Sequence, residues 1–90
     1  MSTNTVTEVG YELCEQHTPS GPRIQVVDAR KFWVASAFLI KKDWCIVIFG
    51  GVPEIDALTI PGTYLRASDK DAAVEWLHFI AKLYVKAVGA

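Results

Sequence analysis

Two apolar runs dominate the middle of the chain, and the short polar stretch Lys41-Lys42-Asp43 separates them. The first run, FWVASAFLI, covers residues 32–40, and the second, WCIVIF, covers residues 44–49. Both are rich in Val, Ile, Phe and Trp, which are typical of strands, so a short polar connection between them predicts an antiparallel hairpin. Neither run alternates between apolar and polar residues, so both faces of this hairpin need a cover.

Weaker patterns predict further strands on either side of the hairpin. Residues 6–16 alternate loosely between apolar and polar side chains, which indicates a half-buried strand, and two prolines and a glycine interrupt the chain over 17–22. A second strand is expected at about 23–28. Residues 50–58 are expected to form a loop or an edge segment, and a last short strand over 58–65 contains a Pro-Gly pair.

The C-terminal part of the chain has the clearest helical pattern. Ser68-Asp69-Lys70-Asp71 resembles a capping box, with Asp in place of the usual Glu, and predicts a helix from there to about Val88. Acidic residues lie near its start and lysines near its end, which suits the helix dipole. Apolar residues recur at helical spacing and are expected to form the face that packs on the sheet: Ala73, Trp76, Leu77, Ile80, Leu83, Tyr84 and Ala87.

Together these elements predict one α+β domain over residues 7–90, after a flexible N-terminal tail over residues 1–6. Its antiparallel sheet has four to five strands, and one long C-terminal helix packs on one face. An alternative is an α/β arrangement with a helix over 29–42, capped by Asp28. That helix would be apolar nearly all round, and 90 residues can scarcely bury it on every side, so the hairpin is preferred.

Composition and charge narrow the classes of protein. The net charge of −1 favours neither a strongly basic nucleic-acid binder nor an acidic mimic of DNA. The first residues lack the basic start and apolar core of a signal peptide, and no apolar stretch is long enough for a membrane span. We therefore expect a small, soluble, cytoplasmic protein without a membrane partner, in which Cys14 and Cys45 are reduced thiols.

Candidate chemistry is sparse. Cys14 and His17 have a spacing that could offer two zinc ligands, which Cys45 and His78 could complete, but structural zinc sites usually contain two close-spaced pairs. A Cys-His nucleophile lacks an obvious orienting residue. Gly50-Gly51 is followed by proline and has no Lys, Ser or Thr to bind phosphate. The sequence thus predicts no enzyme, no catalytic residues, no metal site and no cofactor.

A basic segment with aromatic neighbours keeps one alternative open. Residues 23–42 carry five cations against a single acidic residue, and Phe32, Trp33, Phe38 and Trp44 lie among or beside them. Cations and stacking rings on a sheet could bind single-stranded nucleic acid, so a small nucleic-acid-binding module that uses residues 23–44 is the first alternative function. The simpler interpretation is that the rings are core and the cations keep the strand ends in water.

The apolar surplus of the hairpin favours action by contact. One helix covers one face, and the other face would expose a large aromatic patch unless residues 50–65 and the N-terminal strand cover it. We therefore expect a non-enzymatic protein-binding or inhibitor module that occludes a larger protein, as phage or mobile-element inhibitors of host defence and immunity-type proteins do; a structural homodimerisation domain is the second alternative. The predicted partner-binding residues lie near the hairpin: Trp33, Phe38, Lys41, Lys42 and Trp44.

Overall fold

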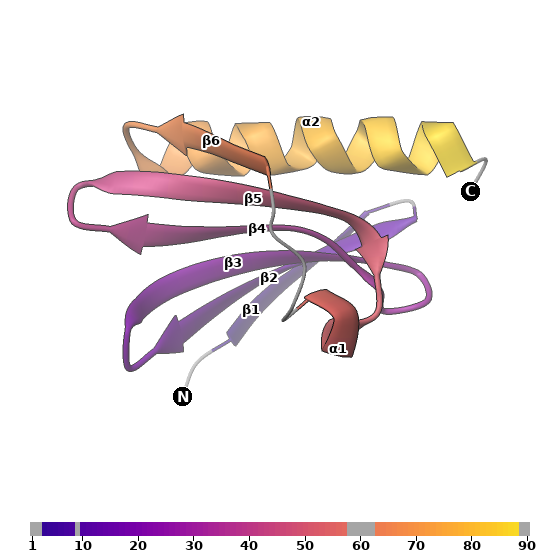
Figure 1. The fold of residues 1–90 in the computed structure, drawn as a ribbon, viewed down its shortest axis with the longest axis horizontal. Helices are drawn as coiled ribbons and strands as arrows, with labels where there is room; N and C mark the ends of the chain where they lie inside the picture. Colours follow the sequence, from indigo (N-terminus) through magenta and orange to yellow (C-terminus); the bar gives the residue numbers. More distant parts are fainter. Residues whose placement is uncertain (1–2, 9, 58–62, 89–90) are drawn as a thin grey trace.

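The computed structural model describes residues 3–8, 10–57 and 63–88, and it consists of one antiparallel sheet and one long helix (Figure 1). Every strand pairs with the next one along the chain, so the order across the sheet follows the order in the sequence. The six strands are β1 (Thr3–Glu8), β2 (Tyr11–Thr18), β3 (Gly21–Asp28), β4 (Trp33–Ile40), β5 (Asp43–Val52) and β6 (Thr63–Ala67). The helices are α1 (Glu54–Ala57) and α2 (Lys70–Val88). The predicted α+β class is confirmed.

The central hairpin forms as predicted. β4 and β5 pair in antiparallel register, and the pair Ile40 and Asp43 closes the turn at Lys41 and Lys42. Lys41 has a positive φ of 58°, as tight hairpin turns require. The alternative helix over 29–42 is not formed, because a strand pair can bury both faces of so apolar a segment within one sheet.

The N-terminal region differs from the prediction. Residues 6–16 are not one strand: they belong to β1 and β2, and Gly10, with a φ of 86°, lies in the turn between them. Residues 3–6, which the prediction assigns to a flexible N-terminal tail over 1–6, are part of β1. β1 forms an edge of the sheet and pairs with β2 along its whole length.

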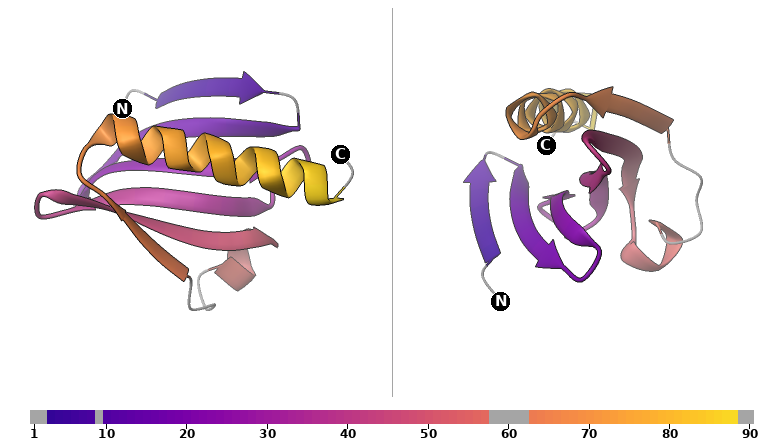
Figure 2. Two further views of the ribbon diagram at one scale, coloured as in Figure 1. Left: turned by 90° about the horizontal axis from the view of Figure 1, so that it is seen from above. Right: turned by 90° about the vertical axis from the view of Figure 1, so that its left-hand side faces the viewer.

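The main core lies between α2 and one face of the sheet. Figure 2 shows α2 lying lengthwise across that face. The sheet contributes Tyr11, Leu13, Ile24, Val26, Val34, Ala35, Ala37, Trp44, Ile46 and Ala67, and the helix contributes Ala73, Leu77 and Ala81. Asp69, rather than Ser68, caps the helix, because its carboxylate oxygen Oδ1 accepts the N–H of Ala72 at 2.8 Å.

A bulge in β4 decides where Trp33 lies. Simple alternation places Trp33 on the same face as Ala35, but the register between β4 and its neighbours shifts between these residues. Trp33 consequently pairs with Val27 and packs with Phe49 and Val52 on the face away from α2. The bulge therefore moves the largest side chain of β4 out of the main core.

The sheet face away from α2 is covered at its centre. Gln25, Ser36 and Val47 lie side by side on it and are buried. α1 lies on this side of the sheet, opposite α2 (Figure 1). The second cluster around Trp33 adds to the cover, so this face does not present the broad exposed aromatic patch that the sequence pattern allows.

Among the described residues, no helix combines the length and apolar character needed to cross a membrane.

Candidate interaction surface

Four large apolar side chains of the described part of α2 are exposed; Val88 is its last residue, and the other three lie along its outer face. Trp76, Phe79 and Leu83 are 41%, 55% and 52% exposed, and we call these three residues the outer stripe. Their spacing of three and then four residues places them along one side of the helix. The helical spacing predicted that Trp76 and Leu83 pack on the sheet, which is wrong because both are exposed, and Phe79 was not among the residues predicted for either face.

A shallow hollow lies at the N-terminal end of the outer stripe. Ala72, Glu75, Trp76 and Phe79 line it, and its volume is about 430 Å³. The rings of Trp76 and Phe79 meet edge to face, with centroids 6.1 Å apart and planes 78° apart. The two rings thus support each other's orientation and form one wall of an apolar hollow that is open to the surroundings.

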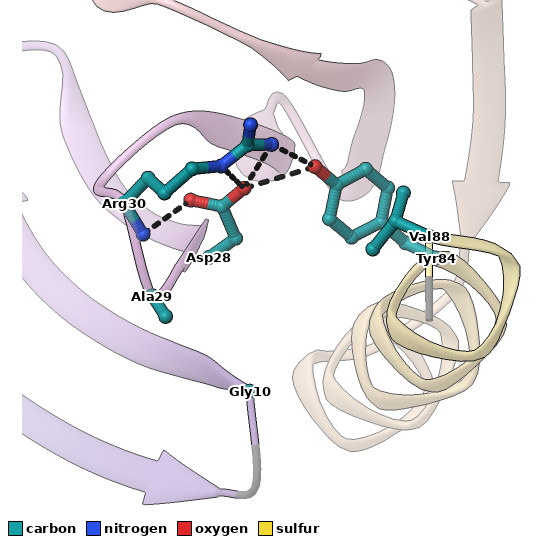
Figure 3. A pocket seen from close by; sticks show the side chains of 6 residues that line it. All are labelled: Gly10, Asp28, Ala29, Arg30, Tyr84 and Val88. Atoms are coloured by element: carbon teal, nitrogen blue, oxygen red, sulfur yellow. Dashed lines mark hydrogen bonds and ion pairs between the residues drawn. The ribbon is translucent and has the colours of Figure 1, made fainter. Parts of the chain in front are cut away.

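A second notable cluster joins the turn between β3 and β4 to α2 (Figure 3). The carboxylate oxygen Oδ2 of Asp28 accepts hydrogen bonds from the Tyr84 hydroxyl at 2.9 Å and from the Arg30 guanidinium at 3.0 Å. Its other oxygen, Oδ1, accepts the backbone N–H groups of Arg30 at 2.8 Å and of Phe32 at 3.0 Å. Each oxygen of this buried carboxylate therefore accepts at least two hydrogen bonds.

These contacts shift the protonation equilibria in the cluster. Burial by itself raises the pKa of Asp28, but the hydrogen bonds donated by Phe32, Tyr84 and Arg30 outweigh it and lower this pKa below the ordinary value of 3.8. Burial, followed by the hydrogen bond to Asp28, raises the pKa of Tyr84. An ionised Asp28 and a neutral Tyr84 are thus stabilised together near neutral pH.

The cluster is better suited to holding the fold together than to chemistry. A carboxylate with a lowered pKa is a weak base near neutral pH, and Asp28 already accepts the hydrogen bonds described above. Tyr84 also packs against Gly51, where an added Cβ would lie 2.2 Å from the Tyr84 hydroxyl oxygen. The cluster therefore fixes the C-terminal half of α2 against the β3–β4 turn and β5.

The predicted partner-binding residues are placed in different environments. Trp44 belongs to the main core and Trp33 to the second cluster, and both are less than one-tenth exposed. Phe38 is half-buried on the face away from α2. Lys41 and Lys42 are exposed at the hairpin turn. The binding role of this set stays a prediction, and its accessible members are the two lysines and Phe38.

The candidate zinc ligands are spread over the molecule. Cys14 lies on β2 and Cys45 on β5, with two strands between them, and they do not form a disulfide bond with each other. His78 is on α2, where its Nδ1 forms a 2.8 Å hydrogen bond with the Tyr11 hydroxyl. Within the described ranges, no three His, Cys, Asp or Glu side chains come together as metal ligands would.

The outer stripe could have been found from the sequence by a different test. Ala72, Trp76, Phe79 and Leu83 are spaced by four, three and four residues, which is the spacing of a helix–helix seam. The helix has apolar residues on two sides, and only Ala73, Leu77 and Ala81 among them are fully buried.

The comparisons with protein families, with curated proteins and with solved structures find no match for the chain.

Proposed function

We propose that this protein is a non-enzymatic interaction module that binds another protein surface through the outer stripe of α2. The observation that carries the proposal is the alignment of Trp76, Phe79 and Leu83 on one exposed helix face. Exposed apolar residues are ordinary when they are scattered, whereas a contiguous group of this kind marks an interaction site. Trp is also among the residue types most enriched at interface hot spots.

The support of the stripe favours binding with little rearrangement. α2 is held by its apolar inner face on the sheet, by the cap at Asp69 and by the hydrogen bond from Tyr84 to Asp28. Its outer side chains are therefore presented by a rigid element, which reduces the entropy lost when a partner binds. A small domain with such a surface can act simply by covering a functional region of a larger protein, so occlusion is the mode of action we propose.

Site-specific photo-crosslinking tests this function. A photoreactive phenylalanine analogue at position 79 is expected to give a defined covalent adduct in cell extract, whereas the same analogue at Lys42, in the exposed hairpin turn, is expected to give none. Mass spectrometry identifies the adduct, and titration of the purified components then establishes a saturable complex. Equal adducts at both positions, or none at position 79, would contradict the proposal.

A further inference from the structure

We propose that the surface bound by the outer stripe is that of a second copy of this chain, with the two α2 helices packed antiparallel. This inference rests on the proposed function of the stripe as a contact surface, and it names the partner. It follows from two properties of α2: the shape of its outer face is complementary to itself, and so is the arrangement of its charges. A self-complementary patch is what a two-fold symmetric interface requires.

The hollow on α2 has the composition of a helix-packing hole. When two helices pack side by side, a side chain of one inserts between four residues of the other at positions i, i+3, i+4 and i+7. The four residues that line the hollow, Ala72, Glu75, Trp76 and Phe79, have this spacing. The seam residues of such a helix line the holes and also supply the side chains that insert into them. Two copies of α2 can therefore pack against each other through this one surface.

An antiparallel register fits the sizes of the side chains. With the two-fold axis crossing the stripe between Trp76 and Phe79, the partner's Phe79 enters the hollow and lies against Trp76. Leu83 then lies opposite the partner's Ala72, so that a large residue meets a small one. By symmetry each of these contacts occurs twice, and the three residues of the outer stripe are all withdrawn from water.

The charges of α2 favour the same orientation. Asp71, Glu75, Lys82 and Lys86 are exposed and lie on one flank of the stripe, within about 60° of the helix circumference. Two antiparallel helices bring these flanks together and place Glu75 beside the partner's Lys82, again twice. The helix dipole accounts for acidic residues near the start and lysines near the end, but it does not account for their confinement to one flank.

Parallel pairing lacks this complementarity. A two-fold axis along the helices would place the charged flank of one copy against the Trp76 and Leu83 side of the other. Glu75 and the partner's Lys82 would then lie on opposite sides of the seam and could not pair. Charged residues that flank a helix seam set its orientation, and here they select the antiparallel arrangement.

Sedimentation velocity of the purified chain over a wide concentration range is the first test. We expect a concentration-dependent dimer whose dissociation constant rises at least 100-fold in Phe79→Asp, on the order of the loss of a hot-spot residue. Ile55→Asp is the matched control, because Ile55 on α1 is 79% exposed and lies away from α2. A dimer that Phe79→Asp leaves unchanged would overturn the inference, and loss of that dimer in Phe38→Glu would place the interface on the hairpin side instead.

Charge reversal tests the orientation. Glu75→Lys is expected to weaken the dimer about 10-fold, because two attractive pairs become repulsive, and the double variant Glu75→Lys/Lys82→Glu is expected to restore it. In a parallel dimer the charged flanks of the two copies lie on opposite sides of the seam, so the single reversal should leave the affinity unchanged. An unchanged affinity in Glu75→Lys would overturn the antiparallel arrangement. A double variant that folds but does not restore the dimer would overturn it as well.

The two proposals fail in different ways. A chain that stays monomeric at every concentration overturns self-pairing. If position 79 then crosslinks to a different protein, the interaction function stands with a heterologous partner. If the chain is monomeric and position 79 crosslinks to nothing, both proposals are wrong.

Discussion

The two faces of α2 differ in how deeply their apolar side chains are buried. The inner face contacts the sheet through Ala73, Leu77 and Ala81, all of which are fully buried. The outer face carries Trp76, Phe79 and Leu83, all of which are more than two-fifths exposed. The fully buried positions of the inner face are thus mostly alanines, with Ile80, Tyr84 and Val85 partly buried around them, whereas the outer face leaves three large apolar residues exposed.

This difference separates two uses of apolar surface. Alanines on the inner face let the helix backbone approach the sheet closely, and Leu77 fills the space between them. The large residues on the outer face contribute less to folding of the single chain, because about half of the surface of each remains exposed to water. Apolar residues at helical spacing therefore form a core only where a surface of matching shape packs against them. In α2 it is the inner face that meets such a surface.

Truncation of a leucine on each face gives the largest contrast. We expect Leu77→Ala to lower the free energy of unfolding by about 3 kcal/mol, because Leu77 is fully buried and its removal leaves a cavity. Leu83→Ala removes the same atoms from the exposed face and should cost less than about 0.5 kcal/mol in the monomer. Urea unfolding at a protein concentration below the dimer range measures both, and similar losses would remove the distinction between the faces.

Two adjacent glycines test how closely the inner side of α2 approaches β5. Gly50 and Gly51 both have positive φ, but only at Gly51 does an added Cβ meet the Tyr84 ring and hydroxyl group. Gly50→Ala is expected to cost about 1 kcal/mol for backbone strain alone, and Gly51→Ala about 2 kcal/mol or more because Tyr84 must also move. Thermal unfolding of the two variants would contradict this packing if their melting temperatures were equal.

The Asp28 cluster predicts a dependence of stability on pH. Because the pKa of Asp28 in the folded chain lies below its ordinary value of 3.8, the stabilisation is fully present above that value and is lost as the pH falls through the folded pKa. Tyr84→Phe removes one hydrogen bond to this carboxylate and should cost about 1 kcal/mol at pH 7.

The cost of Tyr84→Phe should shrink once Asp28 is protonated. Urea unfolding of the wild type and the variant at pH 7 and at acidic pH, together with NMR titration of the Asp28 carboxyl, measures both effects. We also expect the pKa of Asp28 to be higher in the variant than in the wild type, since a hydrogen bond that lowers it has been removed. A cost that is equal at both pH values would show that the hydroxyl acts through packing alone.

Filling the hollow on the outer face should have the smallest effect on folding. Ala72→Leu adds a side chain to the hollow formed with Glu75, Trp76 and Phe79, and we expect the free energy of unfolding to change by less than about 0.5 kcal/mol. The dimer should nevertheless weaken, because the place of the partner's Phe79 is then occupied. Ala73→Leu is the matched variant on the inner face, where overpacking is expected to cost about 2 kcal/mol.

Much of the secondary structure could be predicted from local pattern. The two strand-type runs around Lys41 and Lys42 specify the hairpin, and the apolar spacing after Ser68 specifies the helix to Val88. β1 was missed because an edge strand of mostly polar residues lacks the apolar signal on which the prediction depends. The turn at Gly10 was missed because a single glycine within an alternating segment is a weak turn signal.

The candidate site could be predicted only in part. Its residue types, large aromatics in a contact role, were expected, but they were sought at the hairpin, where Trp33 and Trp44 prove to be buried. A bulge of one residue moved Trp33 to the other face, and alternation alone cannot locate such a bulge. Trp76 and Leu83 of the outer stripe were taken for core because a helix with apolar residues on two sides does not indicate which side meets the sheet.

The sequence by itself determined the class of this protein: a strand-rich chain with an apolar hairpin and one C-terminal helix, since these follow from local periodicity and turn residues. Only the tertiary structure decided the bulge that relocates Trp33, the joining of Asp28 to Tyr84 across 56 residues, and the face on which α2 keeps its large side chains exposed. The physical reason is that periodicity records which residues share a side of an element, whereas burial depends on the shape of the surface that the rest of the chain brings against that side.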